Sequence, residues 1–248
     1  MLILGIETSS TQISAALGGH EGIRAAFQVN RGQRHAELLV PMIRQVCDAA
    51  EVELSELGAL AVGLGPGLFT GLRVGVATAK AMAMALRVPM IGVSSLDLVA
   101  FPARFTSCTI VAVMDARRGE VFSALYRPTP GGLQRLVEPQ VSSPRDLASE
   151  LQAHPEACLM VGDGALRYAE HFEGLRHLEL ADAVLAHPSA RALVALAHAQ
   201  ALREEFVTPD EIRPTYLRKP DAEANWPQRP PGAHTVSPSE QLGSREVG

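Results

Sequence analysis

The stretch from Ala59 to Leu86 constrains this chain most, because a buried strand, a glycine-rich loop and a helix follow one another there. The apolar run before the loop predicts the strand, and the longer segment after it predicts the helix. Glycine inside a helix costs roughly 1 kcal/mol relative to alanine, so interior glycines need a reason. Small residues at every fourth position lie along one helix face, which predicts that this face packs unusually near something. These small residues are Gly71, Gly75, Ala79 and Ala83.

The composition is that of an ordinary globular chain. Of its 248 residues 47% are apolar and 20% are charged, which suits one large domain or two modest ones. The formal net charge of −5 argues against extensive contact of this chain alone with nucleic-acid phosphates. Three widely spaced cysteines indicate neither a zinc site nor a disulfide framework. The first residues lack the positive flank of a signal peptide and are too short to span a membrane, so we expect a cytoplasmic protein.

Apolar runs divide the chain into two similar halves. The first half is predicted to form three strands between residues 2 and 29 and a helix over 34–50. The stretch from Ala59 to Leu86 follows. The second half begins again with three strands, between residues 109 and 141. An acidic residue closes the first strand of each half, Glu7 in one and Asp115 in the other. This suggests an internal duplication.

The same division predicts the domains. We expect a first lobe over residues 1–106 and a second lobe over 107–218. A proline-rich tail over 219–248, which contains the single tryptophan Trp226, is expected to be disordered or loosely attached.

The glycine loop fits none of the known phosphate-binding or nucleophile loops. No lysine follows in the register of a Walker A loop, and Thr70 replaces the third glycine of the dinucleotide pattern. The GxSxG pattern of a nucleophile elbow is absent. The hydroxyl-rich turn after the first strand can hold a phosphate, or its hydroxyls can simply satisfy the turn, and both interpretations stay open.

The two strand-end acids suggest a second kind of site. Glu7 and Asp115 can hold magnesium near phosphates if their strands lie side by side, with Asp97 or Asp163 as the candidate catalytic acid of a phosphotransferase. We favour instead a degenerate nucleotide-binding site. Its residues would be Glu7, Thr8, Ser9, Ser10, Asp115, Gly162, Asp163 and Gly164.

His35 stands at the start of the helix expected over 34–50. A HxxxH metal pair would need a second histidine where Leu39 stands, so His35 has no ligand partner at helical spacing. We therefore expect it to be a surface or capping residue.

Four motifs carry a family resemblance. They are the opening LGIETSS, the block Gly65–Gly75, the run Asp115–Val121 and the close Pro214–Arg218. With them the chain resembles the TsaB (YeaZ) family of bacterial tRNA threonylcarbamoyladenosine biosynthesis, to about residue 218 and without the tail.

The resemblance implies an α/β fold of the actin-like/sugar-kinase/Hsp70 (ASKHA) kind, duplicated into two lobes that each hold a mixed β-sheet flanked by helices. It implies a non-catalytic scaffold or activator that binds a TsaD-type catalytic subunit, which a TsaE-type ATPase joins, with tRNA contacted only indirectly. The complex transfers threonylcarbamoyl from threonylcarbamoyl-AMP to the adenosine following the anticodon, in tRNAs reading codons that begin with A. The alternatives are an ASKHA-type ATPase or phosphotransferase, and an M22-like (glycoprotease-type) metallopeptidase.

We expect no catalytic residue and no metal ligand in this chain, and no cofactor bound by it alone, although ATP and Mg²⁺ can bind in the complex. The expected partner interface joins the apolar face of the helix over 34–50 to the start of the small-residue helix, and the same face can form a homodimer. Its residues are His35, Leu38, Leu39, Met42, Ile43, Val46, Leu68, Phe69, Thr70, Gly71, Arg73, Val74, Gly75, Thr78, Ala79 and Met82.

Overall fold

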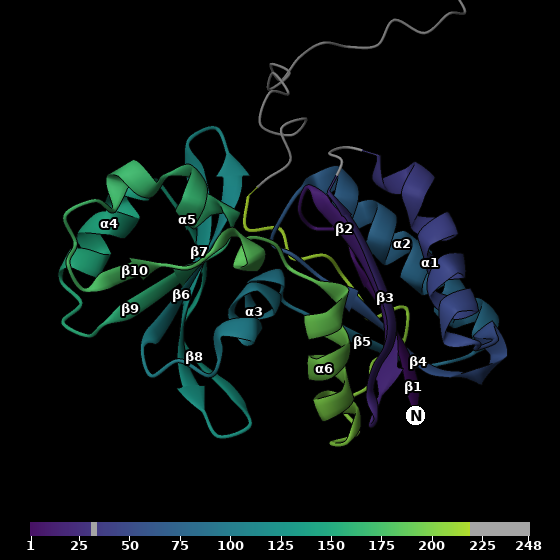
Figure 1. Cartoon of the computed structure of the whole chain (residues 1–248). Coiled ribbons are helices and arrows are strands. Elements are labelled where there is room, and N and C mark those ends of the chain that lie inside the picture. Colours follow the sequence, from purple (N-terminus) through teal and green to yellow (C-terminus); the bar gives the residue numbers. More distant parts are fainter. Residues whose placement is uncertain (31–33, 219–248) are drawn as a thin grey trace, which may run out of the picture. The chain divides into compact units, whose positions relative to one another are not determined.

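The computed structural model describes residues 1–30 and 34–218, and their strands form two five-stranded sheets (Figure 1). Residues 31–33 lie outside the described residues. Residues 219–248, for which a tail containing Trp226 is predicted, also lie outside the described residues.

The first sheet has the strand order β3-β2-β1-β4-β5, with β1 at its centre. β1 runs antiparallel to β2 and parallel to β4. Side chains of β1 alternate between two cores: Leu4 and Ile6 belong to one, and Ile3 belongs to the other. Because both faces of this strand are covered, its sequence is apolar without interruption. The strands are β1 (Leu2–Glu7), β2 (Gln12–Gly19), β3 (Gly22–Asn30), β4 (Leu57–Gly63) and β5 (Met90–Val93).

The second sheet repeats this arrangement. Its order is β8-β7-β6-β9-β10, and β6 runs antiparallel to β7 and parallel to β9, as β1 does with β2 and β4. The equal order and direction of the strands confirm the predicted duplicated fold with a mixed sheet in each lobe. The strands are β6 (Thr109–Arg117), β7 (Glu120–Thr129), β8 (Gly132–Ser142), β9 (Cys158–Val161) and β10 (Leu178–Leu180).

Helices cover both faces of each sheet. Helices α1 (His35–Ala50) and α2 (Phe69–Leu86) pack on one face of the first sheet, and α4 (Pro144–Gln152) and α5 (Asp163–Arg167) on one face of the second. The other faces are covered by α3 (Ser95–Ala100) and α6 (Ala190–Ala201). In the described part of the chain, no helix is both long and apolar enough to cross a membrane. Short 3₁₀ segments are η1 (Leu54–Glu56), η2 (Phe101–Ala103), η3 (Ala169–His171) and η4 (Ala183–Leu185).

Helices α3 and α6 connect the two sheets. Leu96 and Val99 of α3 pack in the core of the second sheet, whereas Leu98 packs with α6 in the core of the first. Helix α6 comes from the range predicted for the second lobe, yet it lies against β1 and β2 (Figure 1). A side chain on Gly5 of β1 would approach Val194 of α6 to 2.9 Å, so this glycine allows the helix to pack closely.

The small-residue stripe of α2 does pack unusually close to a neighbour, as predicted, and the neighbour is the turn after β1. A Cβ atom on Gly71 would collide with the carbonyl oxygen of Thr8, and one on Gly75 with its hydroxyl. Further along the same face, Ala79 and Ala83 are buried in the core of the first lobe. The stripe is therefore an internal contact of this chain.

Replacing Gly71 with alanine tests this contact. Alanine favours the helix by roughly 1 kcal/mol, but its methyl group would press on backbone that cannot move aside. We therefore expect Gly71→Ala to lower the free energy of unfolding by about 1–3 kcal/mol, the usual effect of overpacking. Urea denaturation measures the change.

The matched control is Gly132→Ala, because nothing lies within 4 Å of a Cβ atom at that position. Equal stability of the two variants would contradict the close approach.

Candidate functional site

The turn after β1, which was a candidate phosphate site, is covered by the chain itself. Thr8, Ser9 and Ser10 are buried. The Thr8 hydroxyl donates to the carbonyl of Gly71 (2.8 Å), and the Leu68 amide donates to the carbonyl of Ser9 (2.7 Å). The glycine loop and the first turn of α2 therefore occupy the place that a phosphate would take. This favours the interpretation that the hydroxyls satisfy local structure.

Glu7 lies beneath this turn and is fully buried. Its Oε1 accepts a hydrogen bond from the Ser9 amide (2.6 Å), and its Oε2 has no hydrogen-bond partner and faces Gly63. Burial raises the pKa of Glu7, against the opposing effect of the hydrogen bonds from Ser9. A carboxyl group that is enclosed and favours its neutral form is a poor ligand for magnesium.

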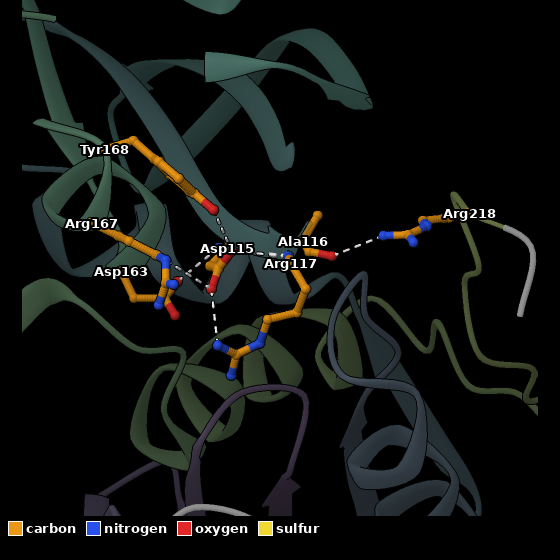
Figure 2. A network of polar contacts seen from close by, with 7 residues as sticks. All are labelled: Asp115, Ala116, Arg117, Asp163, Arg167, Tyr168 and Arg218. Carbon is orange, nitrogen blue, oxygen red and sulfur yellow. Dashed lines mark hydrogen bonds and ion pairs between the residues drawn. The ribbon is translucent and has the colours of Figure 1, made fainter. Parts of the chain in front are cut away.

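Asp115 occupies the equivalent place in the second sheet and has different neighbours (Figure 2). Its Oδ2 forms ion pairs with Nη1 of Arg117 (3.1 Å) and Nε of Arg167 (3.6 Å). Its Oδ1 accepts hydrogen bonds from the Arg117 amide (2.9 Å) and the Tyr168 hydroxyl (3.1 Å). The Asp115 side chain is only 3% exposed. Two guanidinium groups thus stand where a magnesium ion would need open coordination positions.

The loop from Gly162 to Gly164 lies directly on β6. Gly162 has φ +108°, and a Cβ atom there would collide with the carbonyl oxygen of Val113. Asp163 accepts a hydrogen bond from the amide of Asp115 (3.1 Å), and burial raises the pKa of Asp163. The glycines therefore serve the close packing of this loop on the strand.

The structure brings Asp115 and Asp163 together but does not join them to Glu7. Among the described residues, no hydrogen bond or ion pair links Glu7 to either aspartate. Over the same residues, no group of three or more His, Cys, Asp or Glu side chains is arranged to hold a metal ion.

Asp97, the other candidate catalytic acid, binds α3 to the second sheet. Its carboxylate accepts two hydrogen bonds from Nη2 of Arg135 (both 2.7 Å) and one from the Tyr126 hydroxyl (2.7 Å). Burial and the nearby Asp97 charge raise the pKa of Tyr126. These contacts assign Asp97 a structural role.

Two cavities that sequence reasoning missed lie beside the segment leading into α6. One measures about 440 Å³ and is lined in part by Gln12, Gln28, Asn30, Asp163 and His187. The other, of about 480 Å³, is lined in part by Phe101, Arg104 and Arg191. No local motif could have revealed them, because their walls come from strands and helices far apart in the chain.

The residues predicted for the partner interface divide into two groups. Half of them are buried in the core of this chain and are not accessible to a partner; they are His35, Leu39, Met42, Ile43, Val46, Gly71, Gly75 and Ala79. The other half are accessible or partly accessible; they are Leu38, Leu68, Phe69, Thr70, Arg73, Val74, Thr78 and Met82. The physical reason is that the most regular apolar spacing of a helix marks the side that packs on its own sheet.

The expectation that His35 is a surface or capping residue also needs a correction. It is 4% exposed, so it is not a surface residue. Its Nε2 forms a hydrogen bond with the carbonyl oxygen of Ser10 (2.8 Å), which ties the start of α1 to the turn after β1.

Comparison with known proteins gives consistent matches. The model of the family "TsaD: tRNA N6-adenosine threonylcarbamoyltransferase" matches residues 29–226. The Escherichia coli "tRNA threonylcarbamoyladenosine biosynthesis protein TsaB" is 30% identical over 221 residues, 88% of this chain and 95% of that protein. An uncharacterised Mycobacterium leprae protein is 38% identical over 225 residues, 89% of this chain and 56% of that protein, so the chain spans just over half of it. The structure of YeaZ from Pseudomonas aeruginosa superposes with a TM-score of 0.77 at 30% identity, covering 87% of this chain and 99% of that one.

Replacing Glu7 with glutamine tests the burial of its carboxyl group. Because its pKa is raised in the folded state, the folded chain keeps a proton that the unfolded chain releases above the ordinary pKa of 4.5. Stability is therefore fully present below that pKa and is lost as pH rises towards the raised value. We expect Glu7→Gln to remove this dependence and to exceed the native chain in free energy of unfolding at pH 8, because glutamine is neutral at every pH and needs no proton to be buried.

Urea denaturation at pH 5 and pH 8 measures the difference, with the exposed Glu173→Gln as control. A native chain and a Glu7→Gln variant with parallel pH profiles would show that the carboxyl group ionises normally.

Proposed function

Because the chain belongs to the TsaB (YeaZ) family of tRNA threonylcarbamoyladenosine biosynthesis, we propose that it is a non-catalytic subunit that binds a TsaD-type catalytic subunit through the outward face of α1 and α2. In this role it supports the transfer of threonylcarbamoyl from threonylcarbamoyl-AMP to the adenosine following the anticodon. The observation that carries the proposal is that the end of α2, residues 81–86, carries no charged or polar side chain although several of these residues are exposed.

The outward face of α2 is unusual for a helix at the surface. One side of the helix carries the buried stripe against Thr8. Outside this stripe Arg73 and Lys80 are the charged residues, and the final segment 81–86 has none. Met84 is 63% exposed, and it is accompanied by smaller apolar residues. A helical segment that is apolar all round is usually covered on all sides, which supports a partner over the end of α2. The exposed residues of this face are Ala77, Ala81, Met84 and Ala85, with Val40 on α1, and the partly buried Thr78 lies among them.

The surroundings of the two strand-end acids support the non-catalytic role. The Glu7 carboxyl group lies beneath the loop that precedes α2, and the Asp115 carboxylate is occupied by two arginines. Neither acid has room for a substrate or a magnesium ion beside it. We therefore propose that this chain alone binds no cofactor, and that any ATP and Mg²⁺ bind in the complex.

The proposal includes two further partners, a second copy of this chain and a TsaE-type ATPase. When the TsaD-type subunit is absent, two copies of the chain pair through the outward face of α2, because the apolar surface is then otherwise exposed. A TsaE-type ATPase joins the complex of the two different subunits.

Charge placed on the outward face tests the interface. We expect the double variant Ala81→Glu and Met84→Glu to fold normally, since both residues are exposed. It should lose co-purification with the TsaD-type subunit and bind it at least about tenfold more weakly, because unpaired charges would be buried at the contact. Affinity chromatography and titration calorimetry provide the measurements.

The matched control places the same charges elsewhere, as Val184→Glu and Leu202→Glu, which alter exposed apolar residues outside α1 and α2. If the control also loses the partner, or if the Ala81→Glu and Met84→Glu variant keeps it, the proposed interface is wrong.

Reconstitution of the modification reaction tests the function itself. With the TsaD-type and TsaE-type subunits, threonylcarbamoyl-AMP and unmodified tRNA, we expect repeated product formation only when this chain is present. We expect none from this chain alone. Mass spectrometry of digested tRNA detects the modified nucleoside.

The alternative of an ASKHA-type ATPase or phosphotransferase rests on the cavity of about 440 Å³ that includes Asp163. Tight ATP and Mg²⁺ binding with turnover by the isolated chain, measured by calorimetry and phosphate release, would favour that alternative.

A further inference from the structure

Arginines from three separate segments of the chain meet around the turn between β6 and β7, and a fourth, Arg73, is connected to the segment that carries Arg218. Arg117 of this turn and Arg167 of α5 contact the same oxygen of Asp115 (Figure 2). Arg218, from the last described segment, donates to the carbonyl of Ala116 (3.3 Å) and pairs with Glu120 (3.2 Å). These contacts connect three segments to one short turn.

The fourth segment is the start of α2, and Tyr216 connects it to the others. The Tyr216 hydroxyl accepts a hydrogen bond from Nε of Arg73 (3.3 Å). Tyr216 stands two residues before Arg218 in the chain. The Arg73 guanidinium lies 3.8 Å above the Phe69 ring, and the Phe69 and Tyr216 rings are 5.3 Å apart. We call this surface the arginine ridge. Its members are Arg73, Arg117, Arg118, Arg167 and Arg218.

The arrangement of charge leaves guanidinium groups directed to solvent. The Asp115 side chain is 3% exposed, whereas those of Arg117 and Arg167 are 47% and 58% exposed. One buried carboxylate therefore holds two arginines side by side while most of their N–H donors remain in water. The local surface is positive even though the whole chain has a net charge of −5.

The backbone conformation of the turn indicates that its arginines do more than connect β6 to β7. Arg117 and Arg118 have φ +67° and +55°, and Gly119 follows with +75°. Asn, Asp and Gly are the usual residues in such left-handed turns, because other side chains are strained there. Residues held in sparsely populated conformations concentrate at binding sites. Two arginines in this position are thus explained better by a ligand than by turn formation.

We propose that the arginine ridge binds the phosphate backbone of RNA, so that this subunit contacts the tRNA directly. Arginine is suited to this role because its planar guanidinium forms paired hydrogen bonds with phosphate oxygens. The ridge extends over four segments, which matches a series of phosphates along a strand better than a single nucleotide. The partly exposed Tyr216 ring beside it provides a surface on which an unpaired base can stack. The choice of tRNA as the RNA rests on the proposed function.

Removing the two turn arginines tests the ridge while leaving Arg167 to pair with the buried Asp115. We expect Arg117→Gln with Arg118→Gln, in the full chain, to bind a tRNA transcript about tenfold more weakly than the native chain at 100 mM salt. The slope of log affinity against log salt should fall in magnitude by about 1.4–1.8, the contribution of two phosphate contacts. Fluorescence anisotropy at several salt concentrations measures both quantities.

Two controls separate charge from fold and position. Arg117→Lys with Arg118→Lys keeps the charge and should retain most of the salt slope. Arg24→Gln with Arg203→Gln removes two exposed arginines that pair with Glu21 and Glu205, away from the ridge, and should leave tRNA binding unchanged. Thermal unfolding confirms that each variant is folded, and co-purification with the TsaD-type subunit is recorded as a separate readout.

The outcomes distinguish this inference from the proposed function. A folded Arg117→Gln and Arg118→Gln variant with native tRNA affinity and salt slope would overturn the ridge, whatever the chain binds. If that variant keeps native tRNA affinity and loses the TsaD-type subunit instead, the ridge is a protein interface and the RNA proposal is wrong. If the native chain fails to bind the TsaD-type subunit while the salt-dependent tRNA binding still follows the two arginines, the proposed function fails and the ridge stands.

Discussion

The close approach of α2 to the turn after β1 is the contact on which the first lobe depends. Gly71 and Gly75 let the helix lie directly on Thr8, and the Thr8 hydroxyl in turn bonds to the carbonyl of Gly71. His35 adds a hydrogen bond from α1 to Ser10 of the same turn. One short hairpin turn thereby positions both helices of this face, and it buries Glu7 without a partner for one of its oxygens.

The two lobes have used equivalent turns in different ways. In the first lobe the turn after the central strand is covered by a loop and a helix, so its hydroxyls face protein. In the second lobe the corresponding turn remains at the surface and carries arginines, and its aspartate holds them in place. Both lobes have the same arrangement of strands. Their side chains differ, so the turn is covered in the first lobe and carries exposed arginines in the second. The two proposals follow from this difference: the end of α2 faces a protein partner, and the arginine ridge, which includes Arg73 near the start of α2, faces RNA.

Much of the fold could be predicted because its strands and helices depend on local sequence patterns. The central strands are apolar throughout since helices cover both of their faces, and the runs at 2–6 and 109–114 are visible for that reason. The glycine spacing in α2 correctly predicted a close neighbour. It could not identify that neighbour, because a stripe of small residues looks the same whether it meets another molecule or a turn sixty residues earlier in the same chain. That ambiguity explains why the spacing predicts Gly75 and Ala79 as interface residues although they are buried.

By itself the sequence determined the alternation of strands and helices, the duplication and, through its motifs, the family. These depend on short-range periodicity and on residues that are near one another in the chain. Only the tertiary structure decided which side of α2 is accessible, that Asp115 is enclosed by arginines and that Arg117, Arg167 and Arg218 meet at one turn. Those properties arise where segments separated by tens of residues come into contact, and periodicity along one segment contains no information about which segment will lie against it.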